Sequence, residues 1–423
     1  MSRRSVLPAA AGIGLAALLM SGCTPATTSS SEQDGRLRYL IEEQEDPEFL
    51  STIEAHIDDF EEENPGITVE VEAMPFDTMR TVLQTQLQAG DAPDVFNWGS
   101  GPSFAGALAE AGLLYDLTDA YEEYDWPIYE FAKERVTVDG KLIGIPGDLE
   151  TIGIYYNKQI FEDLGIDEPQ NLGDLEAAAA TILEAGIIPF AVSDQEGWQA
   201  GHLLSMTLSS KVGSEGIAAL VEGEESWTSP DVLESLSLWK EWQDAGYLPE
   251  FPTSISYDSG AALYYSGEAA MLPTGSWFIP EVAANTEFES GYIPFPSEDG
   301  RGIFTAGLGS GPLVAANTDN AEAALTFVDF MVSEEHGRWA IENLGTIPPY
   351  PVDTEGVEAL PLLKQVIEDT ATFASGDADL GTNIDVVASD AFNQAMYDGF
   401  QGIFTGQQTP EDVAAALEAA ARS

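Results

Sequence analysis

Polar and aromatic side chains recur next to the ends of the predicted strands in this 423-residue chain. Ten of them form a candidate site: Gln44, Glu45, Asn97, Trp98, Ser100, Asp148, Glu150, Asp194, Trp198 and Trp277. In open α/β sheets, ligands bind in the crevice beyond the carboxyl ends of the strands. Indole rings pack against the C–H faces of a neutral sugar, whose hydroxyls donate to carboxylates and amides. The pattern therefore favours a carbohydrate-binding site.

Motifs for catalysis or cofactor binding do not stand out. His56, His202 and His336 lie far apart on predicted helices, and none forms a pair at ligand spacing, so the sequence predicts no metal site. The chain has no G-x-S-x-G elbow, no phosphate-binding loop and no dinucleotide fingerprint, so we expect no cofactor and no catalytic residue. Acids are so numerous that a glycosidase carboxylate pair stays open as an alternative.

The composition limits the partners of the chain. It has 73 acidic and 15 basic side chains, a formal net charge of −58. The acids are dispersed, which is typical of a solvated surface in high salt or of secreted proteins from alkaline habitats. Without a basic patch, nucleic acid is excluded as a partner. The 44% hydrophobic content and eight tryptophans predict a folded chain.

The N-terminal segment predicts export and a lipid anchor. Arg3 and Arg4 precede a short apolar run, and Leu19–Cys23 matches a bacterial lipobox, so residues 1–22 are expected to be a signal peptide. Cys23 is the only cysteine, and residues 23–35 form a polar tether. We expect an acylated Cys23 that holds the protein on the outer face of the cell membrane. A small buried cysteine at a cleavage site is the alternative.

Strands and helices alternate along the rest of the chain, which predicts an α/β fold. The predicted strands are residues 37–41, 67–71, 94–98, 152–156, 190–192, 269–272, 292–295 and 311–315. The predicted helices are residues 49–63, 79–89, 171–185, 200–222, 232–245, 321–332, 334–343, 360–374, 385–403 and 410–421. Trp239 and Trp242 have helical spacing and are expected in a core. Trp126, Trp227 and Trp339 are expected to be packing or surface residues.

Six motifs, taken in order, resemble the sugar-binding family of extracellular solute-binding proteins of bacterial ABC importers, the maltose-binding-protein-like family. They are Phe60–Val69, Gly90–Trp98, Ala111–Thr118, Gly140–Pro146, Tyr156–Phe161 and Gly267–Trp277. The resemblance implies a two-lobed periplasmic-binding-protein fold (type II-like). Each lobe would be a mixed β-sheet flanked by helices, with three hinge crossings between the lobes. The expected lobes are residues 36–147 with 297–347, and 148–296 with 348–423.

The resemblance also implies roles for particular residues. Glu150 matches a position that binds sugar hydroxyls at the first crossing, and Trp98 and Trp277 match sugar-stacking positions. Trp198 lies near another such position, and Gln44 and Glu45 occupy the loop after the first strand, where polar contacts are common. The implied protein is a monomer that delivers an oligosaccharide to an ABC permease. There are two alternatives. One is a secreted glycoside hydrolase or carbohydrate esterase, and the other is a receptor for a non-sugar solute such as a polyamine.

Overall fold

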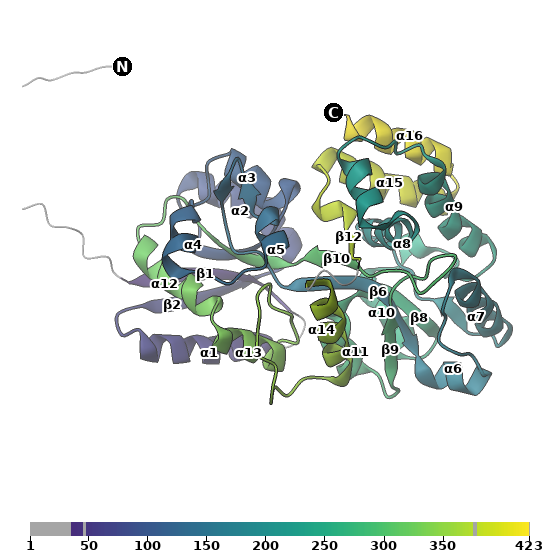
Figure 1. Cartoon of the computed structure of the whole chain (residues 1–423), viewed down its shortest axis with the longest axis horizontal. Coiled ribbons are helices and arrows are strands. Elements are labelled where there is room, and N and C mark those ends of the chain that lie inside the picture. Colours follow the sequence, from purple (N-terminus) through teal and green to yellow (C-terminus); the bar gives the residue numbers. More distant parts are fainter. Residues whose placement is uncertain (1–34, 45–47, 375–378, 423) are drawn as a thin grey trace, which may run out of the picture. The chain divides into compact units, whose positions relative to one another are not determined.

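The computed structural model describes residues 35–44, 48–374 and 379–422. The expectations for the signal peptide, Cys23 and Glu45 lie outside the described residues. Within the described ranges, no helix is long and apolar enough to cross a membrane. Strands and helices alternate as predicted and build two main sheets (Figure 1).

The first sheet has the strand order β11-β3-β1-β2. Its strands are β1 (Arg36–Glu42), β2 (Thr68–Met74), β3 (Val95–Gly99) and β11 (Ser310–Val314). Strand β1 runs parallel to β2 and β3, and β11 is antiparallel to β3. In β1, Tyr39 faces one apolar cluster and Leu40 faces another, so both faces of the strand are buried.

Helices cover both faces of the first sheet (Figure 1). The helices are α1 (Phe49–Glu63), α2 (Phe76–Ala89), α3 (Ala107–Glu110), α4 (Thr118–Tyr124), α5 (Glu130–Arg135), α12 (Ala321–Met331) and α13 (Glu334–Asn343). Met79, Leu83 and Leu87 recur every four residues on α2 and are buried, as an amphipathic helix requires. A π-helical turn, η1 (Pro102–Gly106), follows β3, and the hairpin strands β4 (Thr137–Val138) and β5 (Lys141–Leu142) follow α5.

The second sheet has the order β12-β10-β6-β8-β7, and β9 also pairs with β6. Its strands are β6 (Leu149–Asn157), β7 (Ile188–Phe190), β8 (Ala269–Gly275), β9 (Ser290–Ile293), β10 (Thr305–Leu308) and β12 (Gly381–Thr382). Its longer helices are α6 (Lys158–Leu164), α7 (Leu172–Glu184), α8 (Gln199–Val221), α9 (Pro230–Asp244), α10 (Tyr257–Tyr265), α11 (Ile279–Asn285), α14 (Pro361–Ala374), α15 (Asp390–Thr405) and α16 (Pro410–Ala421). Single 3-10 turns are η2 (Pro252–Ser254), η3 (Ser276–Phe278) and η4 (Ile384–Val386).

The core beneath the second sheet is rich in aromatic rings. Trp239 is fully buried, Trp242 is 2% exposed, and the ring of Trp242 stacks on Phe190 at a centroid distance of 4.8 Å. The expectation that these two tryptophans pack in a core is confirmed. Trp227 is buried in the same cluster. Trp126 is buried in another cluster, together with residues of β1 and α12, and its indole donates to Asp329 Oδ1 at 2.8 Å.

Three chain segments pass side by side between the two sheets. Ile145 N donates to Pro312 O at 3.0 Å, Gly309 N to Asp148 O at 2.9 Å, and Leu149 N to Ile347 O at 2.6 Å. Strand β10 pairs with β6 of the second sheet, whereas β11 pairs with β3 of the first. The change of sheet therefore occurs between Leu308 and Ser310, and the expected boundary at residue 297 lies before β10.

Two of the differences between the structure and the predicted elements concern the neighbourhood of the crossings and Asp385. Strand β10 was not predicted, because its sequence Thr-Ala-Gly-Leu lacks β-branched alternation. The helix predicted from residue 385 begins at Asp390, where the Ser389 hydroxyl caps it by accepting from Phe392 N. Asp385 therefore lies on the separate turn η4.

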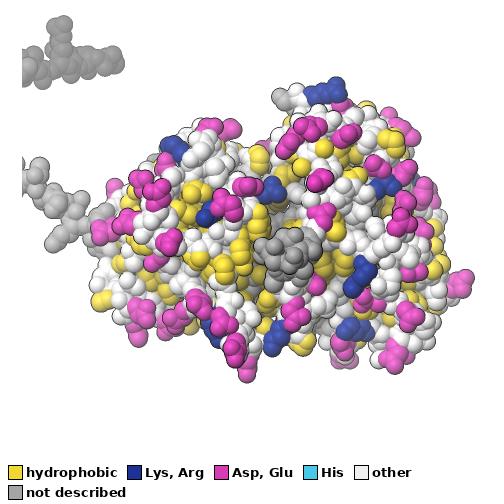
Figure 2. All heavy atoms as spheres, in the orientation of Figure 1, with side chains coloured by type: hydrophobic (Ala, Val, Ile, Leu, Met, Phe, Trp, Pro, Cys, Tyr) yellow, Lys and Arg dark blue, Asp and Glu magenta, His cyan; other side chains and the backbone are white. Residues whose placement is uncertain are grey.

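Acidic side chains are spread over the visible face of the molecule, with few Lys and Arg among them (Figure 2). Among the described residues, most ion pairs have at least one well-exposed side chain, and in the pair of Lys141 with Asp116 both are exposed. Exposed pairs contribute little to stability. The fold is therefore held by its buried apolar clusters rather than by its surface charges.

The crossings predict a sharp effect of one added methyl group. A Cβ on Gly147 would lie 2.1 Å from Gly309 O and 2.6 Å from Ser310 C, both backbone atoms that cannot rotate away. We expect Gly147→Ala to lower the free energy of unfolding by about 1–3 kcal/mol, the usual range for overpacking. Denaturant unfolding in molar salt measures this. The matched control is Gly307→Ala, whose Cβ would meet nothing closer than 3.6 Å. Equal stability of the two variants would contradict tight packing at the crossings.

Candidate functional site

Two carboxylates stand at the start of the first crossing strand. Asp148 and Glu150 flank Leu149, whose side chain is buried in the core, so alternation along the strand directs both acids away from that core. Glu150 pairs with Gly307 in β10, and its Oε1 lies 2.5 Å from the place where a Cβ on Gly309 would stand. The glycine backbone thus leaves the room that the Glu150 carboxylate occupies.

Both of these half-buried carboxylates hold their protons unusually well. Burial raises the pKa of Asp148 to about 7, although a hydrogen bond with Thr346 acts against the rise. Burial raises the pKa of Glu150 to about 8, and the charges of Asp148, Glu42 and Asp385 add to the effect. These groups can therefore donate or accept hydrogen bonds near neutral pH.

Asp385 joins this cluster and was not predicted from the sequence. It lies on η4, directly after β12, with Oδ2 at 3.5 Å from the Tyr397 hydroxyl that donates to it. Burial is the main cause that raises its pKa to about 7. The rule of polar residues after strand ends applies to Asp385, but the two-residue strand β12 carries no sequence pattern that would have drawn attention to it.

An aromatic group lies near the ends of β7 and β8. The Trp198 ring is 4.7 Å from Tyr257 and 5.1 Å from His202, and the Trp277 ring is 5.2 Å from His202. Trp277 Nε1 donates to the Tyr257 hydroxyl at 3.1 Å. The Tyr257 hydroxyl also lies 2.6 Å from Thr274 Oγ1. The structure thus brings together two of the predicted residues, Trp198 and Trp277. No sequence pattern indicated that Tyr257 and His202 would link them.

Trp198 and Trp277 are both half-buried, so each keeps part of its surface exposed. Gly275 permits the placement of Trp277, because a Cβ there would collide with the indole ring. His202 is 6% exposed, and burial lowers its pKa to about 3, so it packs as a neutral ring. Two partly exposed indole rings, held by Tyr257 and His202, suit a ligand with apolar faces.

The predicted residues Asn97, Trp98 and Ser100 lie in β3 or directly after it, and Trp98 and Ser100 are buried. Trp98 is 7% exposed and packs between Phe76 and Phe104, at centroid distances of 5.7 and 5.8 Å. Its Nε1 has no hydrogen-bond partner among the described residues. Asn97 Oδ1 accepts from the Tyr39 hydroxyl at 3.0 Å, and Ser100 is 3% exposed. Trp98 is therefore largely buried, and its role as a sugar-stacking residue stays a prediction.

Asp194 also differs from a surface ligand contact. Its side chain is fully buried, and Oδ1 accepts from Ala200 N at 3.2 Å in the first turn of α8. Burial raises the pKa of Asp194 to about 8. Asp194 therefore supports the first turn of α8, and its contact with a ligand stays a prediction. Gln44 is exposed just after β1.

The fold corrects the expectation that the histidines stay apart. His56 Nε2 on α1 lies 3.0 Å from His336 Nδ1 on α13, and the His56 ring stacks on Trp339 at 3.8 Å. Helix packing joins residues 280 positions apart, which the sequence spacing does not show. No group of three or more His, Cys, Asp or Glu residues within the described ranges is arranged to hold a metal ion.

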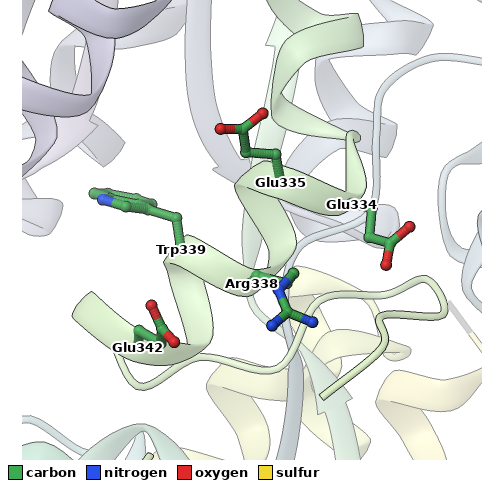
Figure 3. Close-up of a pocket in the computed structure, with 5 residues that line it drawn as sticks. All are labelled: Glu334, Glu335, Arg338, Trp339 and Glu342. Atoms are coloured by element: carbon green, nitrogen blue, oxygen red, sulfur yellow. The ribbon is translucent and has the colours of Figure 1, made fainter. Parts of the chain in front are cut away.

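A shallow pocket of about 510 Å³ lies on α13, apart from the crossing carboxylates and the aromatic group of Trp198 and Trp277. Its lining side chains all come from that helix (Figure 3): Glu334, Glu335, Arg338, Trp339 and Glu342. Trp339 is held by its stacking on His56, in agreement with the packing or surface role expected for it. Side chains from a single helix give a ligand few converging groups, so we place the candidate site at the carboxylates and the aromatic group instead.

The structural role of Asp194 can be tested through pH. An unfolded Asp has a pKa near 3.9, so the folded state holds this proton more tightly. Stability from this group is fully present below pH ~4 and is lost as the pH rises towards about 8. We expect Asp194→Asn, which keeps an oxygen acceptor for Ala200, to be more stable than the wild type at pH 9 by at least ~1 kcal/mol. The advantage should shrink at pH 5. Thermal unfolding at both pH values measures it, with the exposed Asp398→Asn as control. An Asn variant less stable at pH 9 would contradict the assignment.

Three comparisons bear on this fold and site. Residues 46–337 match the model of the bacterial extracellular solute-binding protein family. The chain is 28% identical over 355 residues to the multiple sugar-binding protein of Streptococcus mutans, covering 82% of this chain and 81% of that protein. It is 24% identical over 384 residues to the xylose/arabinose-binding protein XacG of Haloferax volcanii, covering 87% and 81%.

The fold has a close counterpart among solved structures. A chitin oligosaccharide binding protein superposes with a TM-score of 0.80 at 25% identity, covering 92% of this chain and 99% of that one. The two sheets and the segments that cross between them thus correspond to a two-lobed, maltose-binding-protein-like fold. Because the family model spans well over half of the chain, this protein belongs to the bacterial extracellular solute-binding proteins.

Proposed function

We propose that the protein captures an oligosaccharide between its two lobes and delivers this carbohydrate to the permease of an ABC transporter. The observation that carries the proposal is the pair of half-buried indoles, Trp198 and Trp277, held by Tyr257 and His202. The similar proteins are named for binding multiple sugars, xylose or arabinose, and chitin oligosaccharides. These names support a carbohydrate as the ligand.

Each part of the site has a task in this proposal. Trp198 and Trp277 pack against C–H faces of sugar rings, and Asp148, Glu150 and Asp385 exchange hydrogen bonds with hydroxyls. The crossings act as the hinge about which the lobes close. A ligand that contacts both lobes stabilises the closed form, which the permease reads.

We assign the lobes from the strand pairing. The first lobe comprises residues 36–147 and, after Gly309, residues 310–347. The second comprises residues 148–308 and 348–423. The protein acts as a monomer and catalyses no reaction. The acid-rich surface suits a habitat of high salt, and a relative in Haloferax volcanii supports this assignment.

A ligand screen tests the proposal. Malto-, xylo- and chito-oligosaccharides, their monosaccharides and spermidine are titrated into the protein in molar potassium chloride, with thermal shift and calorimetry as readouts. We expect binding of an oligosaccharide, without release of a shorter product on long incubation. Binding of spermidine in the absence of any sugar response would favour a polyamine receptor, and product release would favour a hydrolase.

Trp277→Ala separates recognition from packing. We expect the sugar Kd to rise roughly thirtyfold, equivalent to about 2 kcal/mol for an aromatic hot spot, because the ligand loses its stacking face. The ligand-free protein should keep most of its stability. Trp239→Ala is the matched control: Trp239 is fully buried, so its loss should cost about 3–5 kcal/mol of folding free energy. A strongly destabilised Trp277 variant with unchanged affinity would show that Trp277 is a core residue.

The lipid anchor is proposed from the lipobox at Cys23. We expect mass spectrometry of the native N-terminal peptide to find an acylated Cys23 and the protein to sediment with membranes. Cys23→Ser should release the protein into the medium, because the acyl chains attach through the thiol. A mature N-terminus at another residue would refute the anchor.

A further inference from the structure

Two turns from opposite lobes touch each other. The Ser103 hydroxyl on η1, in the first lobe, donates to Ala388 O of the second lobe at 2.9 Å. Beside this bond, the Gly101 backbone lies so near η4 that a Cβ on Gly101 would stand 2.0 Å from Val386 O. We call this the η1–η4 contact and define it by these four residues. None of the four belongs to the three crossing segments, so the lobes also meet at a place other than the crossings.

The first-lobe side of the contact is fixed by its own hydrogen bonds. Gly101 N donates to Arg135 O at 3.3 Å, and Gly101 O accepts from Gly106 N at 2.8 Å. Gly101 has a φ of 92° and a ψ of 176°, a conformation that is essentially restricted to glycine. The Phe104 ring of the same turn packs on Trp98 at a centroid distance of 5.8 Å. The turn therefore has a defined shape and adjoins a residue of the candidate site.

The second-lobe side is anchored in the same way. Ile384 N donates to Ser205 Oγ of α8 at 2.9 Å, and Asn393 Nδ2 of α15 donates to Asp385 O at 2.6 Å. Ala388 N donates to Ile384 O at 2.9 Å, which places the acceptor loop against η4. Each side of the contact is thus part of its own lobe, so the contact forms and breaks as the lobes move as rigid bodies.

One pair of opposite charges adds to the attraction between the lobes at this place. The Arg80 guanidinium carbon of α2 lies 5.7 Å from the centroid of the Phe104 ring, on the first-lobe side. Burial raises the pKa of Asp385 on η4 to about 7, and the charge of Arg80 acts in the opposite direction. Arg80 and the ionised form of Asp385 therefore attract each other across the lobes.

We propose that the η1–η4 contact is a clasp between the lobes, in which Ser103 and Gly101 are positioning residues that prolong the residence of the bound sugar. This inference rests on the proposed function. When the lobes separate about the crossings, the hydrogen bond of Ser103 and the contact of Gly101 with Val386 are lost. The clasp therefore stabilises the arrangement in which the two turns touch over every wider one. A sugar held between the lobes then leaves more slowly.

The size of the effect follows from one neutral hydrogen bond. Such a bond shifts an equilibrium roughly fivefold, equivalent to about 1 kcal/mol. The clasp acts after the sugar has entered, so its loss raises the dissociation rate and leaves the association rate unchanged. Ser103 is the residue to substitute, because it is half-buried and Ala removes only its hydroxyl. A substitution of Gly101 would strain the turn itself, whatever the lobes do.

Sugar dissociation kinetics test the clasp. The tightest-binding of the screened malto-, xylo- or chito-oligosaccharides is followed by stopped-flow fluorescence in molar potassium chloride. We expect Ser103→Ala to raise the dissociation rate and the Kd roughly fivefold, and Ser103→Thr, which keeps the hydroxyl, to stay near the wild type. The matched control is Ser237→Ala, which loses a 2.7 Å hydroxyl bond to Leu233 O inside the second lobe and should change neither value. A dissociation rate in Ser103→Ala that is unchanged or lower would overturn the inference.

A wedge variant tests the same contact without sugar. Ser103→Trp places an indole where the hydroxyl meets Ala388 O, so the lobes can no longer approach to the observed distance. We expect small-angle scattering of the ligand-free protein in molar salt to give a larger radius of gyration than for the wild type. Ser51→Trp, at an exposed position on α1, is the control, and thermal unfolding checks that each variant is folded.

The wedge variant also separates this inference from the proposed function. Equal radii for the folded Ser103→Trp variant and the wild type would overturn the clasp even if sugar binds. A failed sugar screen together with the larger radius would refute only the proposed function.

Discussion

The structure depends on close backbone-to-backbone contacts between glycine residues at the crossings. Gly147, Gly309 and Gly311 pack backbone against backbone, and any Cβ at Gly147 or Gly311 would overlap a neighbouring main-chain atom. Only such close packing lets three segments run side by side with the hydrogen bonds that join them. The same glycines leave room beside Gly309 for the Glu150 carboxylate. The same close packing therefore shapes both the proposed hinge and the polar end of the candidate site.

Burial has two different effects in the candidate site: it orients aromatic rings on one side and opposes the ionisation of carboxylates on the other. On the aromatic side, His202 and Tyr257 contact Trp198 and Trp277 and fix the orientation of their rings. On the acidic side, burial opposes ionisation of Asp148, Glu150 and Asp385. A sugar suits both sides, since it offers apolar C–H faces to the rings and hydroxyls to the carboxyls.

The sequence predicted the parts of this arrangement that local patterns encode. The helix at residues 49–63 was predicted with its observed bounds, because Ile57 and Phe60 give a periodic apolar face and Asn64-Pro65-Gly66 ends it. The start of α16 was visible in Thr409, which forms a capping box with Asp412. The motif around Pro146 placed Glu150 at the crossing, where the structure has it.

Properties that arise only when distant segments meet were not predictable. Asp385 belongs to the site because η4 returns beside α8 and α15, and the pairing of His56 with His336 depends on the packing of α1 on α13. Trp98 lies near the end of β3 and Asp194 follows β7, yet Phe76 and Phe104 pack around the first and Ala200 N donates to the second. A position next to a strand end places the backbone of a residue near the candidate site. Whether its side chain is exposed there depends on the packing of the surrounding helices.

A crystal structure of the protein with its bound oligosaccharide tests the central claim most directly. The account predicts sugar rings stacked on Trp198 and Trp277, with hydroxyls within hydrogen-bond distance of Glu150 and contacts to both lobes. Sugar bound elsewhere, for example in the pocket beside Trp339 on α13, with the aromatic group and the crossing carboxylates untouched, would contradict it.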